Sequence, residues 1–371
     1  MYSFPKNTKI TSSDKFYFTC PSYGFISPVL SLIDDVIAHN PEITIVVMDE
    51  HMRSFWDGLV KNKDLDWNIL FLDTTPPGRY RDVLSWFRAG AAIQKLYEEH
   101  FRSVENAYFY CCGHASDLIL FSLVKLISRR NNVAFLNILY PGAHRCYSLK
   151  ALILLLHTWI FYRLNVVIKR FDYKETPFIF LSERYFRKLG IQLHEFQYHY
   201  DVRLFQKYNP IPACYTAGKK IVWLDDDCSL YGSEMQDRVF DSLKEIKSII
   251  DKNFTPQEIL LKSHPNPIFH AKNLVPIYRD YEELPSFMNA DFVISTPDVR
   301  FILGGNSAVL STAAIHTNVA AISYLKLMPF QDQNTKRDVI DFLMRLGDQK
   351  ILFVDSLEEL DLLFKTGKNS Y

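Results

Sequence analysis

The sequence predicts an α/β protein of two doubly wound, Rossmann-like domains that face a central cleft. Its 371 residues suggest two domains of ~150–200 residues each. Short apolar runs alternate with amphipathic helical patterns, as strands and crossover helices do in a parallel sheet. Hydrophobic residues make up 48% of the chain and aromatic residues 15%, which excludes a disordered or fibrous protein.

The first domain is expected to span residues 1–200. Its apolar runs predict strands at Phe16–Cys20, Ile43–Met48, Asn68–Leu72, Ala107–Cys112, Val133–Leu139 and Phe178–Leu181. Amphipathic stretches predict helices at Pro28–His39, Arg81–Phe101 and Ala115–Arg130. The stretch from Phe196 to Gly218 carries Pro210 and Pro212 among aromatic and polar residues, and it predicts a linker.

The second domain, residues 219–371, shows the same rhythm. Strands are predicted at Lys220–Leu224, Glu258–Lys262, Asp291–Ser295, Val319–Tyr324 and Ile351–Val354. Helices are predicted at Ser233–Ile250, Ser307–His316 and Thr335–Leu346. Ligands of open parallel sheets bind outside the carboxyl ends of the strands, so the active site is expected in the cleft between the two halves.

Charge and motif content narrow the chemistry. Lysine plus arginine equals aspartate plus glutamate, 42 against 42, so no global field recruits nucleic acid and an anion must be recognised locally. The chain lacks a G-x-G-x-x-G after its first strand, a phosphate-binding G-x-x-x-x-G-K-[ST] loop, and any zinc-site spacing of cysteine and histidine. We therefore expect no cofactor and no metal, and an activated substrate that carries phosphate.

The sequence indicates a cytoplasmic protein. Its six cysteines show no paired C-x-x-C spacing, which is typical of a reduced chain, and residues 1–14 lack the apolar core of a secretory signal. The apolar stretch Leu149–Ile168 is interrupted by His157, Arg163 and Asn165. Two interpretations of this stretch stay open: a buried packing helix, or an interfacial helix on the inner face of the cytoplasmic membrane.

Two motifs of the second domain indicate a phosphate site. His264 follows a predicted strand and precedes Pro265, which disfavours the α region for the histidine and directs its imidazole outward. Gly304 and Gly305 precede a predicted helix that begins near Ser307, where backbone N–H groups can hold an anion. The predicted nucleotide-binding residues are Lys262, His264, Pro265, Gly305, Asn306 and Ser307. The alternatives are a turn histidine and plain helix capping.

Further groups are candidates for acid–base work. Asp225, Asp226 and Asp227 close the first strand of the second domain and can supply a general base or a D-x-D metal site, with turn capping as the alternative. His144 and His114 each follow a predicted strand end in the first domain, although a structural histidine is an alternative for each. The hydroxyls of Ser311 and Thr312, one turn into the glycine-led helix, are expected near the phosphate oxygens.

The His264-Pro265 and Asn306-Ser307 motifs resemble the HP and serine motifs of bacterial sialyltransferases and polysialyltransferases of the glycosyltransferase-B (GT-B) fold. The resemblance implies that both motifs grip the phosphate of a CMP-activated nine-carbon sugar acid, and that His264 assists departure of CMP. It implies inverting transfer of a nonulosonic sugar to a hydroxyl of a bacterial surface glycan, in capsule or lipooligosaccharide.

The chain departs from this family at the third motif, two acidic residues followed by glycine. After the predicted strand Val133–Leu139 stands Tyr140-Pro141-Gly142, which keeps only the glycine. The general base therefore stays open, with Asp226 and His144 as the leading candidates and His114 as another.

Two other functions and two partner contacts stay open. CDP-glycerol-type phosphotransferases also carry Lys-x-His-Pro and serine-rich helix starts, and a degenerate, non-catalytic transferase is a third hypothesis. The expected partners are the CMP-sugar donor and a glycan acceptor, without nucleic acid. A homodimer and a peripheral contact with the inner membrane are left undecided.

Overall fold

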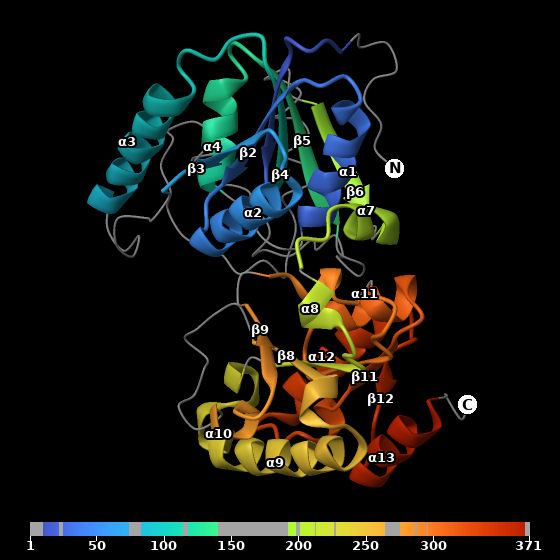
Figure 1. Ribbon diagram of the computed structural model, residues 1–371. Helices are drawn as coiled ribbons and strands as arrows, with labels where there is room; N and C mark the ends of the chain where they lie inside the picture. The colour runs from blue at the N-terminus through green and yellow to red at the C-terminus, as the bar shows by residue number, and fades with distance from the viewer. Residues whose placement is uncertain are drawn as a thin grey trace. The chain divides into compact units, whose positions relative to one another are not determined.

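The computed structural model describes residues 10–21, 25–73, 83–113, 118–139, 192–197, 201–211, 213–225, 228–263, 275–285, 288–294 and 296–367. The chain divides into two compact units, Met1–His199 and Tyr200–Tyr371. Each unit contains a six-stranded parallel sheet with helices packed against it (Figure 1). The predicted fold class, α/β with two doubly wound sheets, is confirmed.

The strands of the first unit follow the order β3-β2-β1-β4-β5-β6. They are β1 Lys15–Thr19, β2 Glu42–Val47, β3 Trp67–Phe71, β4 Tyr108–Gly113, β5 Asn132–Leu139 and β6 Gln192–Gln197. The first five match predicted strands, and the predicted strand Phe178–Leu181 lies outside the described residues. Sequence reasoning missed β6, because its alternating polar residues lack the apolar run used to find the others.

Aromatic side chains form both faces of the first sheet. Tyr17 stacks on Phe109 with ring centroids 4.4 Å apart, and Phe16 stacks on Tyr108 at 4.9 Å. Because side chains alternate along a strand, these two stacks lie on opposite faces of the sheet. The face that carries Tyr17 and Phe109 packs against the apolar side of two helices.

Four helices of the first unit are described. They are α1 Ile26–Ile37, α2 Glu50–Lys63, α3 Val83–His100 and α4 Leu118–Ile127. Figure 1 shows α3 and α4 side by side, where they cover the face of Tyr17. Local chemistry fixes the start of α2, where Asp49 accepts the backbone N–H groups of His51 and Met52 at 2.9 and 3.2 Å.

The second unit repeats the strand order with its own six strands, β12-β11-β10-β7-β8-β9. They are β7 Ile221–Leu224, β8 Ile259–Lys262, β9 Glu282–Leu284, β10 Phe301–Gly304, β11 Ala320–Ser323 and β12 Leu352–Phe353. Numbered within its own unit, each sheet has the order 3-2-1-4-5-6 of dinucleotide-binding folds. The predicted strands that correspond to β7, β8, β11 and β12 are confirmed.

The helices of the second unit are α7 Val202–Lys207, α8 Ala213–Thr216, α9 Gln236–Asn253, α10 Val275–Tyr278, α11 Ala308–His316, α12 Gln333–Leu346 and α13 Leu357–Thr366. The three predicted helices correspond to α9, α11 and α12. Helix α13 packs beside α9 (Figure 1), and Phe254, which follows α9, meets Phe364 of α13 edge to face at 5.1 Å.

The predicted strand Asp291–Ser295 is wrong. Ala290–Phe292 forms a 3-10 helix, whose preceding residue Asn289 accepts the backbone N–H of Asp291 at 3.0 Å. The apolar run is fully buried, and a short buried run does not distinguish a strand from a helix by its periodicity. The strand that enters the sheet is β10, ten residues later, and it ends in Gly304.

The predicted linker from Phe196 to Gly218 is also wrong in part. It begins inside β6 and contains the short helices α7 and α8. Phe205 of α7 packs edge to face on Phe292 at 4.6 Å, and the Asn209 side chain donates to the Phe292 carbonyl at 3.5 Å. These contacts attach the segment to the second unit, since burying the Phe205 ring is more favourable than leaving it in solvent.

Candidate functional site

The candidate site lies at the carboxyl edge of the second sheet, where the strand order reverses. Strands β7 and β10 are neighbours, yet the chain continues from β7 to β8 on one side and from β10 to β11 on the other. Such a switch point is where doubly wound sheets bind ligands. The residues that follow these two strands are Asp225 and Gly305 to Ser307, and Lys262 ends the adjacent strand β8.

Lys262 is a buried cation at this edge. The residue is 7% exposed, and its Nζ donates to the carbonyl of Ser263 at 2.8 Å. Burial lowers the pKa of Lys262 to about 8, and the carboxylates of Glu283 and Asp225 oppose that shift. A partly desolvated ammonium gains more from a phosphate than a hydrated one does, because the local dielectric is low.

Asp225 is the one member of the predicted triple-aspartate motif that the structure describes. It is 7% exposed, and its carboxylate accepts the hydroxyl of Tyr278 at 3.2 Å. Its backbone N–H donates to the Lys262 carbonyl at 2.9 Å, which continues the β7–β8 pairing beyond the strands. Sequence reasoning missed Tyr278 and Glu283, because neither occurs in a motif of recognisable spacing.

The start of α11 supplies the second part of the site. A Cβ on Gly304 would lie 3.1 Å from the Leu224 Cβ, so this glycine allows β10 to approach β7 closely. The Gly305 carbonyl accepts the Ser323 hydroxyl at 3.1 Å. Ser307 is the N-cap residue, and its Oγ accepts the Val309 N–H at 3.4 Å. Asn306 and Ser307 are half-buried and Ala308 is exposed, so solvent reaches the helix start.

The expectation for Ser311 and Thr312 is wrong. Ser311 Oγ donates to the Ala308 carbonyl at 2.6 Å, and Thr312 Oγ1 donates to the same carbonyl at 3.5 Å. Both residues are buried. Hydroxyls inside a helix commonly bond a carbonyl one turn back, so these two belong to the helix and do not surround the phosphate.

Several predicted groups lie outside the described residues: His264, Pro265, Asp226, Asp227, His144 and His114, and with them the apolar stretch 149–168. Their predicted roles stay predictions. What the structure does bring to one edge is Lys262, Asp225 and the start of α11. Within the described ranges, no helix is both long enough and apolar enough to cross a bilayer.

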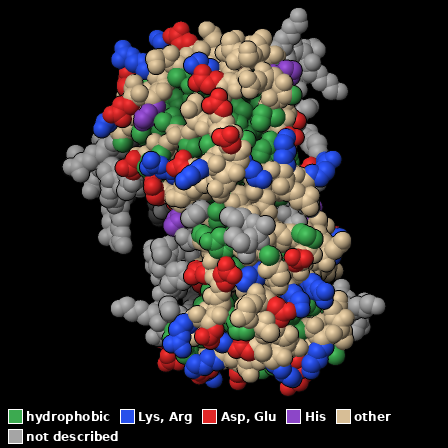
Figure 2. All heavy atoms as spheres, in the orientation of Figure 1, with side chains coloured by type: hydrophobic (Ala, Val, Ile, Leu, Met, Phe, Trp, Pro, Cys, Tyr) green, Lys and Arg blue, Asp and Glu red, His purple; other side chains and the backbone are tan. Residues whose placement is uncertain are grey.

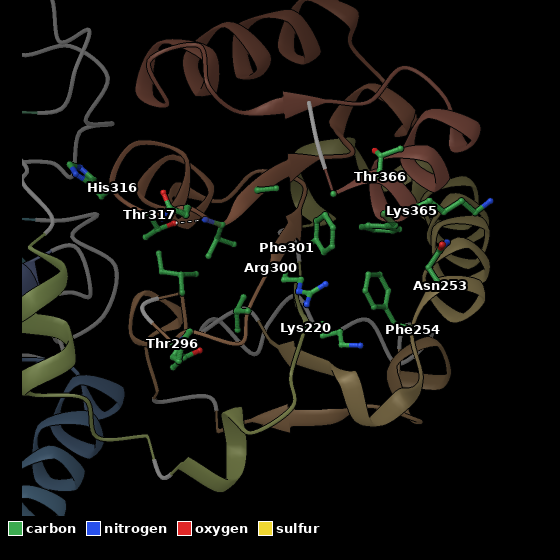
Figure 3. A pocket seen from close by; sticks show the side chains of 18 residues that line it. Lys220, Asn253, Phe254, Thr296, Arg300, Phe301, His316, Thr317, Lys365 and Thr366 are labelled. Atoms are coloured by element: carbon green, nitrogen blue, oxygen red, sulfur yellow. Dashed lines mark hydrogen bonds between the residues drawn. The ribbon is translucent and has the colours of Figure 1, made fainter. Parts of the chain in front are cut away.

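A cavity of about 790 Å³ lies at the other edge of the second sheet (Figure 3). Its basic residues Lys220 and Arg300 directly precede β7 and β10, so it opens at the amino ends of the strands. Helices α9, α11 and α13 end there, and helix carboxyl termini carry partial negative charge. Lys220 also pairs with the Glu258 carboxylate, so the helix ends and this carboxylate make the cavity a poor phosphate site despite its size.

Surface charge adds no competing site on the face drawn in Figure 2. Lysine and arginine side chains are interspersed there with aspartate and glutamate on both units. A mixed surface of this kind produces no extended field of one sign. Recognition of an anion therefore depends on local groups such as Lys262.

No protein-family model matches the chain, and no curated protein matches it in sequence. Among solved structures, it is similar to an alpha/beta-galactoside alpha-2,3-sialyltransferase from Photobacterium phosphoreum, with 12% identity, a TM-score of 0.49, and coverage of 95% of this chain and 100% of the other.

Two other solved structures each cover 96% of this chain and 100% of their own. LpCGTa in complex with UDP has 9% identity and a TM-score of 0.40, and a UDP-glucosyltransferase from Polygonum tinctorium has 10% and 0.39. Because identities and TM-scores are low, the activity has to be inferred from the residues of this chain.

Proposed function

We propose that this protein is an inverting glycosyltransferase of the GT-B type. It would move a nonulosonic, sialic-acid-like sugar from a CMP-activated donor to a sugar hydroxyl of a surface glycan. The observation that carries the proposal is the placement of Lys262 and the start of α11 on either side of β7, at one carboxyl edge. Two interstrand spacings amount to roughly 10 Å, a separation that one nucleotide can bridge.

The proposed chemistry divides between the departing and the attacking oxygen. The bond from the sugar's anomeric carbon to the CMP phosphate breaks through an oxocarbenium-like state, and negative charge grows on the phosphate. Lys262 and the backbone N–H groups at Ser307 stabilise that charge, and one such preorganised donor is typically worth ~3 kcal/mol. His264 follows β8 by two residues and is proposed to assist CMP departure.

A general base must take the proton of the acceptor hydroxyl as its oxygen attacks the anomeric carbon. We propose Asp226 or His144 for this task, as the sequence suggests. Asp225, although described, is buried and already accepts the Tyr278 hydroxyl. It therefore suits a structural role better than proton transfer.

The first test is nucleotide preference. Thermal unfolding is followed with CMP, CDP, UDP, GDP and ADP, each at high excess, since a ligand at 100 times its dissociation constant stabilises by ~2.7 kcal/mol. A selective shift with CMP, followed by CMP release from CMP-sialic acid or a related CMP donor, supports the proposal. Absence of both binding and release across these donors rejects it.

The second test uses a matched pair of lysine variants. Lys262→Met should weaken CMP about ten- to a hundredfold, because a hydrogen bond to a charged group is worth ~1.5–3 kcal/mol. Lys350→Met removes an exposed lysine of the same unit that pairs with Asp348 at 3.5 Å, and it should bind CMP normally. Equal affinity of the two variants would remove Lys262 from the site.

The reaction product distinguishes a glycosyltransferase from the alternative, a CDP-glycerol-type phosphotransferase. If the enzyme transfers a phosphoalcohol, as CDP-glycerol-type enzymes do, mass analysis finds phosphate in the product and CDP donors shift the melting curve. If it transfers a sugar, the acceptor gains only the mass of the glycosyl group.

A further inference from the structure

Strand β9 carries two consecutive glutamates, and two buried lysines, Lys219 and Lys262, lie in the same unit. Glu282 forms an ion pair with Lys219, in which the Lys219 Nζ lies 2.7 Å from the Glu282 carboxylate. The next residue, Glu283, accepts a hydrogen bond from the Ser263 hydroxyl. Because neighbouring residues of a strand point to opposite faces, the two carboxylates serve different surroundings. Lys219 lies two residues before β7, whereas Lys262 ends β8 and Ser263 follows it.

Ser263 connects Glu283 to the cation of the candidate site. Its hydroxyl donates to Glu283, and its carbonyl accepts the Lys262 Nζ at 2.8 Å. Strand register adds to this linkage, since Leu261 pairs with Glu283 and Lys262 with Leu284. The end of β8 is thereby held by backbone pairing and by a side-chain contact from β9.

The charged groups around Lys262 come from two strands. Glu283 of β9 and Asp225 after β7 both favour its protonated form, with Glu283 the larger influence. Tyr278 of α10 donates to Asp225 at 3.2 Å. A buried ammonium loses hydration, and only nearby opposite charge keeps it protonated near neutral pH. Glu283 is exposed, so a change there disturbs packing little.

We infer that Glu283 is a positioning residue of the anion site: through Ser263 it holds the end of β8, where Lys262 meets a nucleotide phosphate, and it supplies a negative charge linked to that lysine by the Ser263 hydrogen bonds. The identity of the anion rests on the proposed function. The linkage between Glu283 and Lys262 does not rest on it and is tested without any nucleotide.

The first experiment measures the Lys262 pKa directly. The protein is labelled with ¹³Cε-lysine, the Lys262 signal is assigned with Lys262→Met, and its shift is followed by NMR against pH. Glu283→Gln should lower the pKa by about one unit, as expected for removal of a neighbouring opposite charge. Glu282→Gln is the matched control, because it makes the same change one residue away and should leave Lys262 unchanged.

The second experiment measures CMP affinity against pH. The wild type should bind well below pH 8 and lose affinity above it as Lys262 deprotonates, whereas Glu283→Gln should lose affinity at lower pH. Near pH 6, where Lys262 is charged in both proteins, the affinities should agree within about threefold. A purely structural role for Glu283 would instead weaken binding equally at every pH.

The two experiments distinguish failure of the Glu283–Lys262 linkage from failure of the proposed CMP site. An unchanged Lys262 titration in Glu283→Gln overturns the inference, even if CMP binds. A shifted titration without CMP binding by the wild type supports the linkage and rejects the proposed nucleotide. If Glu283→Gln fails to fold by circular dichroism, Ser263→Ala releases the carboxylate from its tether and should also lower the Lys262 pKa, and an unchanged titration in that variant overturns the inference.

Discussion

The two units share one strand order but bury different polar groups. In the described part of the first unit, the buried polar side chains are the hydroxyls of Thr19, Ser27 and Thr44. The described part of the second unit buries the ionisable side chains of Lys219, Asp225, Lys262 and Asp291. Burying a charge is costly unless it is paired and hydrogen-bonded. The second unit therefore carries a free-energy cost that its fold does not require.

The difference is sharpest at the carboxyl edges. In the first unit, Thr19 Oγ1 donates to the Cys112 carbonyl at 2.9 Å, and Cys20, Cys111 and Cys112 are fully buried. In the second unit, Asp225 follows β7 as Cys20 follows β1, and the start of α11 is reached by solvent. The same topology thus carries buried apolar residues at the described ends of β1 and β4 and charged residues at the ends of β7 and β8, so chemistry follows from the site and not from the fold.

The largest expected effect is the loss of stability when a buried tryptophan is removed from the core of one unit. Trp223 is fully buried in β7 and meets the Tyr278 ring edge to face at 5.0 Å. Trp223→Ala should destabilise the second unit by about 3–5 kcal/mol, the usual cost of deleting a large buried ring. Hydrogen exchange should show lost protection in residues 200–371. Trp56→Ala, at a fully buried position of α2, should do the same in residues 1–199. These predictions assume that each unit unfolds on its own. Equal loss of protection in both units from either variant would contradict that assumption.

The second largest effect concerns the free-energy cost of burying the Asp291 carboxylate. Burial raises the pKa of Asp291 to about 6, against ~3.9 in an unfolded chain. Between these values the folded state binds more protons, so stability falls as pH rises from about 4 to 6. Asp291→Asn should remove that slope and gain up to about 3 kcal/mol at pH 7, from two pK units at ~1.36 kcal/mol each. Denaturant unfolding at pH 4 to 7 measures it.

The control for Asp291 is Asp348→Asn, at an exposed loop position. It should keep the wild-type dependence of stability on pH. If Asp291→Asn also keeps the wild-type dependence on pH, burial of the Asp291 carboxylate costs the folded state little, and the two units differ less in the cost of their buried polar groups.

A smaller effect distinguishes capping from anion binding at α11. Ser307→Ala should cost ~1 kcal/mol of stability, the usual loss for an N-cap hydroxyl. Ser307→Asp keeps a good cap but adds negative charge where the phosphate is proposed to sit. The aspartate variant should therefore melt near the wild type yet bind CMP at least tenfold more weakly. Normal CMP binding by Ser307→Asp would mean that Ser307 only caps the helix.

The smallest expected effect concerns the buried cysteines of the first unit, which should not react with a thiol reagent in the folded protein. Burial raises the pKa values of the Cys20, Cys111 and Cys112 thiols, and thiolate is the reactive form. A thiol reagent at pH 7.5 should leave these three cysteines unmodified in folded protein and label them in denaturant, as read by peptide mass analysis. Rapid labelling of Cys112 in the folded state would show that this edge opens.

Local patterns determined much of the result from sequence alone. Apolar runs located nine strands, among them β8, and the small polar residues after Gly304 located the start of α11, which Ser307 caps. These signals are readable because burial pattern and capping depend on residues within a few positions of each other. The nucleotide-binding role of His264 and Pro265 has only this sequence basis, since both lie outside the described residues.

The tertiary structure decided what depends on distant residues. It turned Asp291 into part of a 3-10 helix and put β10 in the sheet instead, because the buried runs 291–294 and 301–304 look alike in sequence and only packing selects between them. It also paired β8 with β9, which brings Glu283 into contact with Ser263, the residue after Lys262. No spacing rule predicts such a pair, since strand pairing depends on contacts between segments far apart in the chain.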